Sequence, residues 1–156
     1  MSGQIILSEY RPGEAAALVR LFYNTVHSVC LGDYTQEQVD AWADGTADPA
    51  VWEQSFLRHQ TLVARIGGEI AGFADLDGDY LDRLYVHRDF QRQGVATALA
   101  QALEQRAAEK GFSRMTVPAS VTARPFFEKR GWRVVREQQV ERKGVFLPNF
   151  IMEKDL

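Results

Sequence analysis

The sequence predicts a single α/β (α+β) domain, residues 1–156, in which helices flank a mixed, mostly antiparallel sheet of about seven strands. Its 156 residues match the length of about one domain. The spacing of apolar residues changes from helical to strand-like near residue 60 and back near residue 94. With 46% hydrophobic and 25% charged residues, the composition is that of an ordinary globular protein. A chain of this size buries roughly two-thirds of the surface that its unfolded form exposes.

The N-terminal third predicts one strand followed by helices. Gln4–Glu9 is short, apolar and β-branched, which favours a strand. Apolar residues at helical spacing predict a long amphipathic helix from Glu14 to about Leu31. Thr35 followed by Gln38 is a capping-box pattern that opens a second helix. A further short helical piece is expected after Pro49.

The middle of the chain predicts three successive antiparallel strands. They are Gln60–Ile66, Glu69–Leu76 and Tyr80–Val86. Gly67-Gly68 joins the first two, because two glycines permit the positive φ values of a tight hairpin turn. Asp77-Gly78 supplies the second turn.

The C-terminal part predicts alternating helices and strands, closed by a hairpin. Gly111 and Gly131 are expected to end the two helices, and Lys143-Gly144 to form the hairpin turn. The expected elements, in order, are a helix over Gly94–Lys110, a strand over Arg114–Val117, a helix over Thr122–Arg130, and strands over Trp132–Arg142 and Val145–Lys154.

Charge and composition exclude several classes of function. The 18 Lys and Arg against 21 Asp and Glu give a net charge of −3, so no chain-wide attraction to nucleic acid or anionic membrane is expected. Ala15–Val19 is the longest apolar run, far short of the roughly 20 residues of a membrane span. Met1–Gln4 does not open a signal peptide, and Cys30, the single cysteine, cannot form an internal disulfide. We therefore expect a cytoplasmic protein.

The segment that carries chemistry runs from a strand end at Leu84–Val86 into the helix that begins at Gly94. The first turn of a helix has unpaired N–H groups and the positive end of the helix dipole, so it can hold a phosphate or pyrophosphate. Gly94 and Ala96 let an anion approach the backbone, and Arg92 adds positive charge. Neither a nucleoside-triphosphate loop nor a dinucleotide fingerprint is present. A phosphate-bearing ligand is predicted, and a plain helix start is the alternative.

Two motifs in this part of the chain resemble those of one enzyme family. Gln91-x-x-Gly94-x-Ala96 resembles the (Arg/Gln)-x-x-Gly-x-(Gly/Ala) motif of the GNAT acyltransferases. Residues 120–132, SVTARPFFEKRGW, resemble the second family motif, Asn-x-x-Ala-x-x-Phe-Tyr-x-x-x-Gly-Phe. The order of predicted elements also matches. Residues 33–43, the run 119–128 and the Pro148–Phe150 ending resemble the YafP-type bacterial branch.

The resemblance implies a sheet that splays between its fourth and fifth strands and binds acetyl-CoA there. The pantetheine arm would pair with the fourth strand, and the pyrophosphate would lie on the amides of the loop and helix start. No metal is implied. The cofactor-binding residues carried over in this way are Leu84, Tyr85, Val86, Gln91, Arg92, Gln93, Gly94, Val95, Ala96, Thr97, Ser120 and Phe127.

The catalytic roles carry over only in part. The family's general acid is a Tyr at the position of Phe127, and a phenyl ring has no proton to donate. Ser120 stands at the position of the family's Asn. Either CoA leaves as an unassisted thiolate, or a hydroxyl of Tyr85, Ser120 or Tyr34 replaces the missing Tyr.

Asp82 is the expected general base. By two-residue alternation it shares a strand face with Leu84 and Val86. Its carboxylate can deprotonate an ammonium directly or through water and attract a cationic acceptor. The alternative is that Asp82 simply pairs with Arg83 or another surface charge.

The sequence thus predicts an N-acetyltransferase that moves an acetyl group from acetyl-CoA directly to the amine of a small molecule in a ternary complex. The alternatives are acetylation of a protein N-terminus or lysine, and a catalytically weak acyl-CoA sensor. A homodimer stays an open alternative. The residues expected to contact the acceptor are His27, Tyr34, Trp42, Tyr80 and Asn149.

Two patterns that suggest a metal fail on closer reading. His27 and Cys30 are three apart, on one face of the expected first helix, but two ligands do not make a zinc site. Asp75-Leu-Asp77-Gly-Asp79 begins like a calcium loop, yet Tyr80 stands where that loop needs Gly, so a hairpin turn is expected instead.

Overall fold

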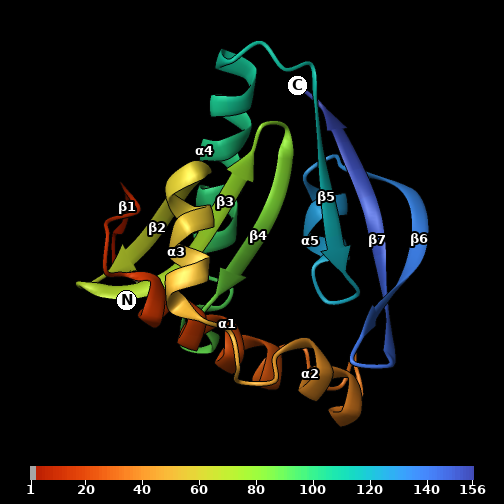
Figure 1. Ribbon diagram of the computed structural model, residues 1–156. Helices are drawn as coiled ribbons and strands as arrows, with labels where there is room; N and C mark the ends of the chain where they lie inside the picture. Colours follow the sequence, from red (N-terminus) through yellow and green to blue (C-terminus); the bar gives the residue numbers. More distant parts are fainter. Residues whose placement is uncertain (1–2) are drawn as a thin grey trace.

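The computed structural model describes residues 3–156 as one seven-stranded mixed sheet with helices on both faces (Figure 1). The expectation that no signal peptide begins at Met1–Gln4 falls partly outside the described residues, because these do not include Met1 and Ser2. Among residues 3–156, no helix is long and apolar enough to cross a membrane.

The strands lie in the order β1-β2-β3-β4-β5-β7-β6. All neighbours are antiparallel except β4 and β5, which are parallel. This confirms the predicted mixed sheet, and β5 runs three residues further than expected. The bounds are β1 (Ile5–Glu9), β2 (Gln60–Ile66), β3 (Glu69–Asp77), β4 (Tyr80–Val86), β5 (Arg114–Ser120), β6 (Arg133–Arg142) and β7 (Val145–Asp155).

The helices divide between the two faces of the sheet, and Figure 1 shows α3 in front of it and α4 behind. Side chains alternate along a strand, so Val63 and Phe73 pack under α1–α3, while Leu62 and Ala74 join the core beneath α4 and α5. The bounds are α1 (Ala15–Ser28), α2 (Gln36–Trp42), α3 (Pro49–Arg58), the 3₁₀ turn η1 (Arg88–Phe90), α4 (Val95–Glu109) and α5 (Arg124–Lys129).

Local sequence signals fix several element boundaries. The Thr35 hydroxyl accepts the Gln38 N–H at 3.1 Å, and the Gln38 side chain accepts the Thr35 N–H at 2.9 Å, which is the predicted capping box of α2. The Asp48 carboxylate caps α3 by accepting a backbone N–H of its first turn at 2.9 Å. Gly67 and Gly68 have φ values of 59° and 84°, the positive values that the β2–β3 hairpin turn requires.

The end of α1 differs from the prediction, because the helix stops at Ser28 rather than near Leu31. Gly32 takes a φ of 107°, and the Tyr34 N–H bonds the carbonyl of Cys30 at 3.0 Å, so the chain turns there. Cys30 is buried but lies beyond the helix. The expectation that His27 and Cys30 share one face of a helix is therefore wrong.

The sheet splays between β4 and β5, as predicted. Within the described residues these two strands pair at Tyr80–Thr116 alone, whereas β5 pairs with β7 along the whole length of β5, up to Ser120–Asn149. β4 and β5 therefore diverge toward their C-terminal ends, which α1 and α2 cross (Figure 1). α1 packs on β4 and α2 on β7, so both halves of the sheet share this helical layer.

Candidate active site

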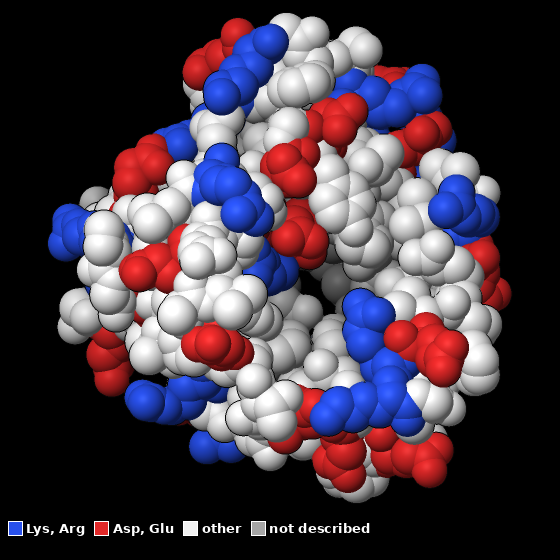
Figure 2. All heavy atoms as spheres, in the orientation of Figure 1, with Lys and Arg blue, Asp and Glu red and all other residues white. Residues whose placement is uncertain are grey.

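Two adjoining cavities open where β4 and β5 diverge. The loop cavity, about 340 Å³, lies between the end of β4, residues 90–97 and the end of β5. The aromatic cavity, about 520 Å³, lies between α1, residues 42–47, the start of β4 and the β6–β7 hairpin. Figure 2 shows a hollow in this part of the surface, with acidic side chains gathered above it and Lys and Arg side chains below it.

A small set of residues lines both cavities and so forms their junction. These junction residues are Trp42, Asp82, Arg83, Tyr85, Pro118 and Ser120. The structure thus brings together all three residues that the sequence predicts as catalytic, Asp82, Tyr85 and Ser120. A group held in the loop cavity can meet a molecule in the aromatic cavity at this point.

The start of α4 is built to receive an anion. Gly94 precedes the helix in the left-handed region, with φ 85°, and no side chain caps the helix or places a carboxylate in its first turn. Arg92 is also left-handed, with φ 60°. The first amides of α4 therefore remain available at the positive end of the helix dipole, inside the loop cavity.

Most of the predicted cofactor-binding residues line the loop cavity, but two glutamines have local roles. The Gln91 side chain donates to the Val86 carbonyl at 2.7 Å and so ties the loop to the end of β4. Gln93 lies outside the lining and donates to the Asp89 carbonyl at 3.4 Å. The lining residues are Leu84, Tyr85, Val86, Gln91, Arg92, Gly94, Val95, Ala96, Thr97, Ser120 and Phe127.

Phe127 forms part of the cavity wall and is 1% exposed. Its ring packs edge-on against Phe126 and Trp132, each with a centroid distance of 5.1 Å. Such pairs stabilise a core beyond the area that they bury. Phe127 therefore contributes packing, and its side chain offers no proton to a leaving group.

Asp82 is the junction carboxylate, and its side chain is 37% exposed. Burial raises the pKa of Asp82 and the nearby Asp75 carboxylate raises it further, while Arg83 and His59 lower it. The distances argue against the alternative that Asp82 mainly pairs with Arg83, because Arg83 lies closer to Asp75. Arg83 Nη2 lies 3.7 Å from Asp82 Oδ2 but 2.6 Å from Asp75 Oδ2.

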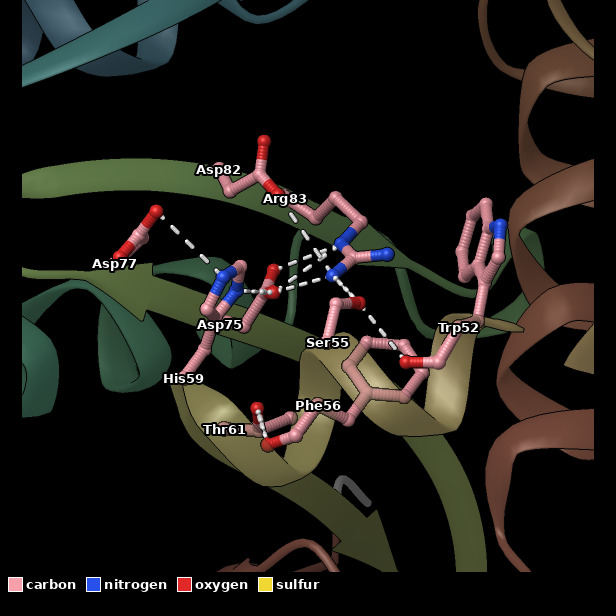
Figure 3. A network of polar contacts seen from close by, with 9 residues as sticks. All are labelled: Trp52, Ser55, Phe56, His59, Thr61, Asp75, Asp77, Asp82 and Arg83. Atoms are coloured by element: carbon pink, nitrogen blue, oxygen red, sulfur yellow. Dashed lines mark hydrogen bonds and ion pairs between the residues drawn. The ribbon is translucent and has the colours of Figure 1, made fainter. Parts of the chain in front are cut away.

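Arg83 belongs to a buried network that sequence reasoning missed (Figure 3). Its Nε and Nη2 donate to the fully buried Asp75 carboxylate, and Nη2 also donates to the Ser55 hydroxyl at 2.7 Å. The guanidinium lies 4.7 Å from the Trp52 ring and 4.5 Å from the Phe56 ring. The available signal was a charged residue at an interior position of the apolar strand β3.

His59, Asp75 and Asp82 place potential metal ligands within 4.8 Å of one another. The Asp75 oxygens, however, already accept from Arg83 and face His59 at 2.7 Å, so the guanidinium provides the positive charge that this carboxylate needs. The cluster is an ion-pair network as it stands. That the protein uses no metal stays a prediction.

Four of the five predicted acceptor contacts line the aromatic cavity: Tyr34, Trp42, Tyr80 and Asn149. Asn149 Oδ1 is buried and has no hydrogen-bond partner among the described residues. His27 lies outside the lining. Its Nε2 is 2.6 Å from the Ala43 carbonyl and its ring stacks on Tyr23, so it contacts the end of α2.

The Tyr34 hydroxyl joins three segments around the site. It donates to the Pro148 carbonyl at 2.6 Å and accepts the Val121 N–H at 2.9 Å, and burial raises its pKa. Since its proton is already committed to Pro148, Tyr34 is a poor candidate for proton transfer.

Tyr34→Phe should lower the free energy of unfolding by about 1–3 kcal/mol, because it leaves the Pro148 carbonyl and the Val121 N–H without their partner. Urea unfolding measures this change. Tyr23→Phe, at a side chain that is 37% exposed, is the control and should stay near wild type. Equal midpoints for the two variants would contradict the structural role of the Tyr34 hydroxyl.

Comparison with known proteins places these features in one family. Residues 30–156 match the family model for the acetyltransferase (GNAT) domain. Over 148 residues the chain is 35% identical to the uncharacterized N-acetyltransferase YafP of Escherichia coli K12, covering 95% of this chain and 94% of that protein.

Solved structures agree in fold. A GCN5-related N-acetyltransferase from Rhodopseudomonas palustris is 36% identical and has a TM-score of 0.94, covering 100% of this chain and 98% of the other. The PaiA N-acetyltransferase from Thermoplasma acidophilum, solved in complex with coenzyme A, has a TM-score of 0.76 at 19% identity, covering 98% and 99%. The second likeness concerns the fold alone. The predicted fold class is thereby confirmed.

Proposed function

Because the chain belongs to the GNAT acetyltransferase family, we propose that it transfers the acetyl group of acetyl-CoA, bound in the loop cavity, directly to the amine of a small molecule bound in the aromatic cavity. The observation that carries this proposal is the junction, where Asp82, Tyr85 and Ser120 line both cavities. If acetyl-CoA lies in the loop cavity with its acetyl group at the junction, an amine in the aromatic cavity would be within reach of the acetyl carbonyl carbon.

The loop cavity suits acetyl-CoA in charge and shape. The uncapped amides of α4 would take the pyrophosphate, with Arg92 beside it. The β4 edge at Leu84–Val86, which β5 does not cover, would pair with the amides of the pantetheine arm, as an added strand does. A protein of the same fold, the putative acetyltransferase yncA from Salmonella typhimurium, was determined with its cofactor acetyl-CoA, which supports the choice of this cofactor.

The chemistry follows from the junction residues. Asp82 takes one proton from the acceptor ammonium, and the neutral amine attacks the thioester carbonyl carbon. The tetrahedral intermediate then collapses, its C–S bond breaks, and the Tyr85 hydroxyl protonates the leaving thiolate. The second proton of the amine restores Tyr85. No covalent enzyme intermediate forms.

Tyr85 is the proposed donor because its side chain lines both cavities and its phenol is protonated before the reaction begins. Burial raises its pKa, so the phenolate left after proton transfer is a strong base that readily takes the second proton of the amine. Tyr85→Phe should lower kcat by about 100-fold and leave the Kd for acetyl-CoA unchanged. Steady-state thiol release and calorimetry measure the two quantities. If Ser120→Ala shows the loss and Tyr85→Phe does not, the donor is Ser120 instead.

The aromatic cavity favours a small cationic amine over a protein substrate. Its volume falls within the range of roughly 300–1,000 Å³ typical of small-molecule sites. Arg83 and Arg142 also line the cavity, and Asp44 is paired with Lys143, so the attraction for a cation comes from Asp82 at the junction and from the aromatic faces. The aromatic lining residues are Phe22, Tyr23, Tyr34, Trp42, Trp52, Tyr80 and Tyr85.

The test is thiol release from acetyl-CoA over a panel of arylalkylamines, polyamines, amino acids, and peptides with a free N-terminus or a lysine, followed by mass spectrometry of the product. We expect turnover with a small amine. Turnover with peptides alone would identify a protein acetyltransferase. Tight acetyl-CoA binding without turnover on any amine would favour an acyl-CoA sensor, the role that Phe127 in place of Tyr permits. Cytoplasmic location and the lack of nucleic-acid and membrane partners stay predictions from the sequence.

A further inference from the structure

A nearly buried histidine lies close to Asp82, and the proposed reaction assigns it no role. His59 follows the last turn of α3, and its side chain is 10% exposed. Its Nδ1 lies 2.7 Å from Asp75 Oδ2. Both Asp75 oxygens already accept hydrogen bonds from the Arg83 guanidinium, so Asp75 acts as an acceptor toward His59 as well. In the neutral imidazole this contact favours the proton on Nδ1 and the lone pair on Nε2.

The His59 ring is also close to Asp82 and to an exposed carboxylate. A carboxylate oxygen of Asp82 lies within 4.8 Å of a ring nitrogen of His59, a separation that one bridging water can span. Nε2 lies 3.6 Å from Asp77 Oδ2, and the Asp77 side chain is 67% exposed at the β3–β4 turn. Figure 3 shows the His59 ring between Asp75 and Asp77, with Asp82 nearby on β4.

We infer that His59 is a relay residue that passes to solvent the proton that Asp82 takes from the acceptor amine. The inference rests on the proposed function. Protonated Asp82 gives its proton to a bridging water, which gives one of its own to His59 Nε2, while Nδ1–H stays on Asp75. The imidazolium then releases the Nε2 proton past Asp77 to bulk water. Each group returns to its starting state, and one proton leaves per acetyl group transferred.

The surroundings of His59 suit this task. Asp75 and Asp77 of β3 and Asp82 of β4 face the ring with negative charge and stabilise the transient imidazolium, while Arg83 opposes it. An acceptor in the aromatic cavity covers the side of Asp82 that faces this cavity. The side toward His59 is then an exit for the proton that the acceptor does not cover.

His59→Gln tests the relay, because the amide can still donate to Asp75 but cannot carry a proton. With the amine that turns over in the panel, we expect a several-fold loss of kcat in dilute buffer, recovery on adding imidazole, and an unchanged KM for acetyl-CoA. The wild type and Arg58→Gln, at the exposed neighbour on the same helix end, should not respond to imidazole. A loss that imidazole does not restore, or no loss at all, overturns the relay.

Two further measurements separate failure of the relay from failure of the proposed function. Full turnover in Asp82→Asn would rule out both Asp82 as the base and His59 as the relay. A loss of activity in Asp82→Asn, together with full activity of His59→Gln in dilute buffer, would rule out the relay alone. NMR of ¹⁵N-histidine, with His59 assigned through His59→Gln, needs no turnover. We expect the Nδ1–H form and a shift of the Nε2 resonance in Asp82→Asn. An Nε2–H form, or no response to Asp82→Asn, overturns the relay whatever the amine.

Discussion

Asp82→Asn should lower kcat/KM for the amine by about 10²–10⁴-fold, the usual contribution of a general base, with the affinity for acetyl-CoA unchanged. The amide keeps the size of the side chain and its position at the junction, but it cannot accept the ammonium proton. Steady-state thiol release gives the rate, and calorimetry gives the acetyl-CoA affinity.

The pH dependence provides a second readout for the same variant. Burial and Asp75 raise the pKa of Asp82, so the protonated, inactive form persists to a higher pH than for an ordinary aspartate at about 3.9. In the wild type, kcat/KM should fall as the pH decreases through this raised pKa. Asp82→Asn should remove that acidic limb, because the group that titrates is gone.

Asp79→Asn is the matched control, since it makes the same change at an exposed aspartate between β3 and β4. It should keep the wild-type rate and pH profile. An Asp82→Asn enzyme with an unaltered acidic limb would show that Asp82 is not the base, whatever the size of its rate loss.

Short-range signals explain why most of the fold could be predicted. The Thr35–Gln38 capping box and the Gly67-Gly68 turn each act within four residues, so their physical effect can be read directly from the sequence. The same holds for the entry to α4 at Gly94. The end of α1 was misplaced because Val29 continues the apolar spacing, whereas the turn through Gly32 ends the helix.

The site was predictable only where it coincides with a local motif. The loop and the start of α4 were found in this way, whereas the contact of His59 with Asp75 depends on the packing of α3 over β3. Likewise, the side chain of His27 turns to the Ala43 carbonyl, a choice that the position of α2 decides. The partners in each pair lie 16 positions apart along the chain, so spacing alone cannot reveal the contacts.

Gly94→Glu should raise the Kd for acetyl-CoA by about 100-fold or more. A carboxylate at the start of α4 would compete with the pyrophosphate for the helix amides and repel it, and losing two charge-assisted hydrogen bonds costs roughly 1.5–3 kcal/mol each. A Cβ at Gly94 meets only Ile5 Cδ1, at 3.8 Å, so the new side chain has room. The expected effect thus comes from the negative charge placed beside the first amides of α4.

Backbone strain is the competing explanation, because Gly94 has a φ of 85° and other residues adopt that conformation at a cost of roughly 1–2 kcal/mol. Gly111 tests it, since it lies just beyond the opposite end of α4 with a φ of 91° and open space around it. Gly111→Glu introduces comparable strain and the same charge far from the first amides of α4. In calorimetry this variant should therefore bind acetyl-CoA like the wild type. Gly94→Ala adds the strain without the charge and should weaken binding less than Gly94→Glu. Wild-type affinity in Gly94→Glu would place the pyrophosphate away from the start of α4, because no anion could share those amides with a neighbouring carboxylate at no cost.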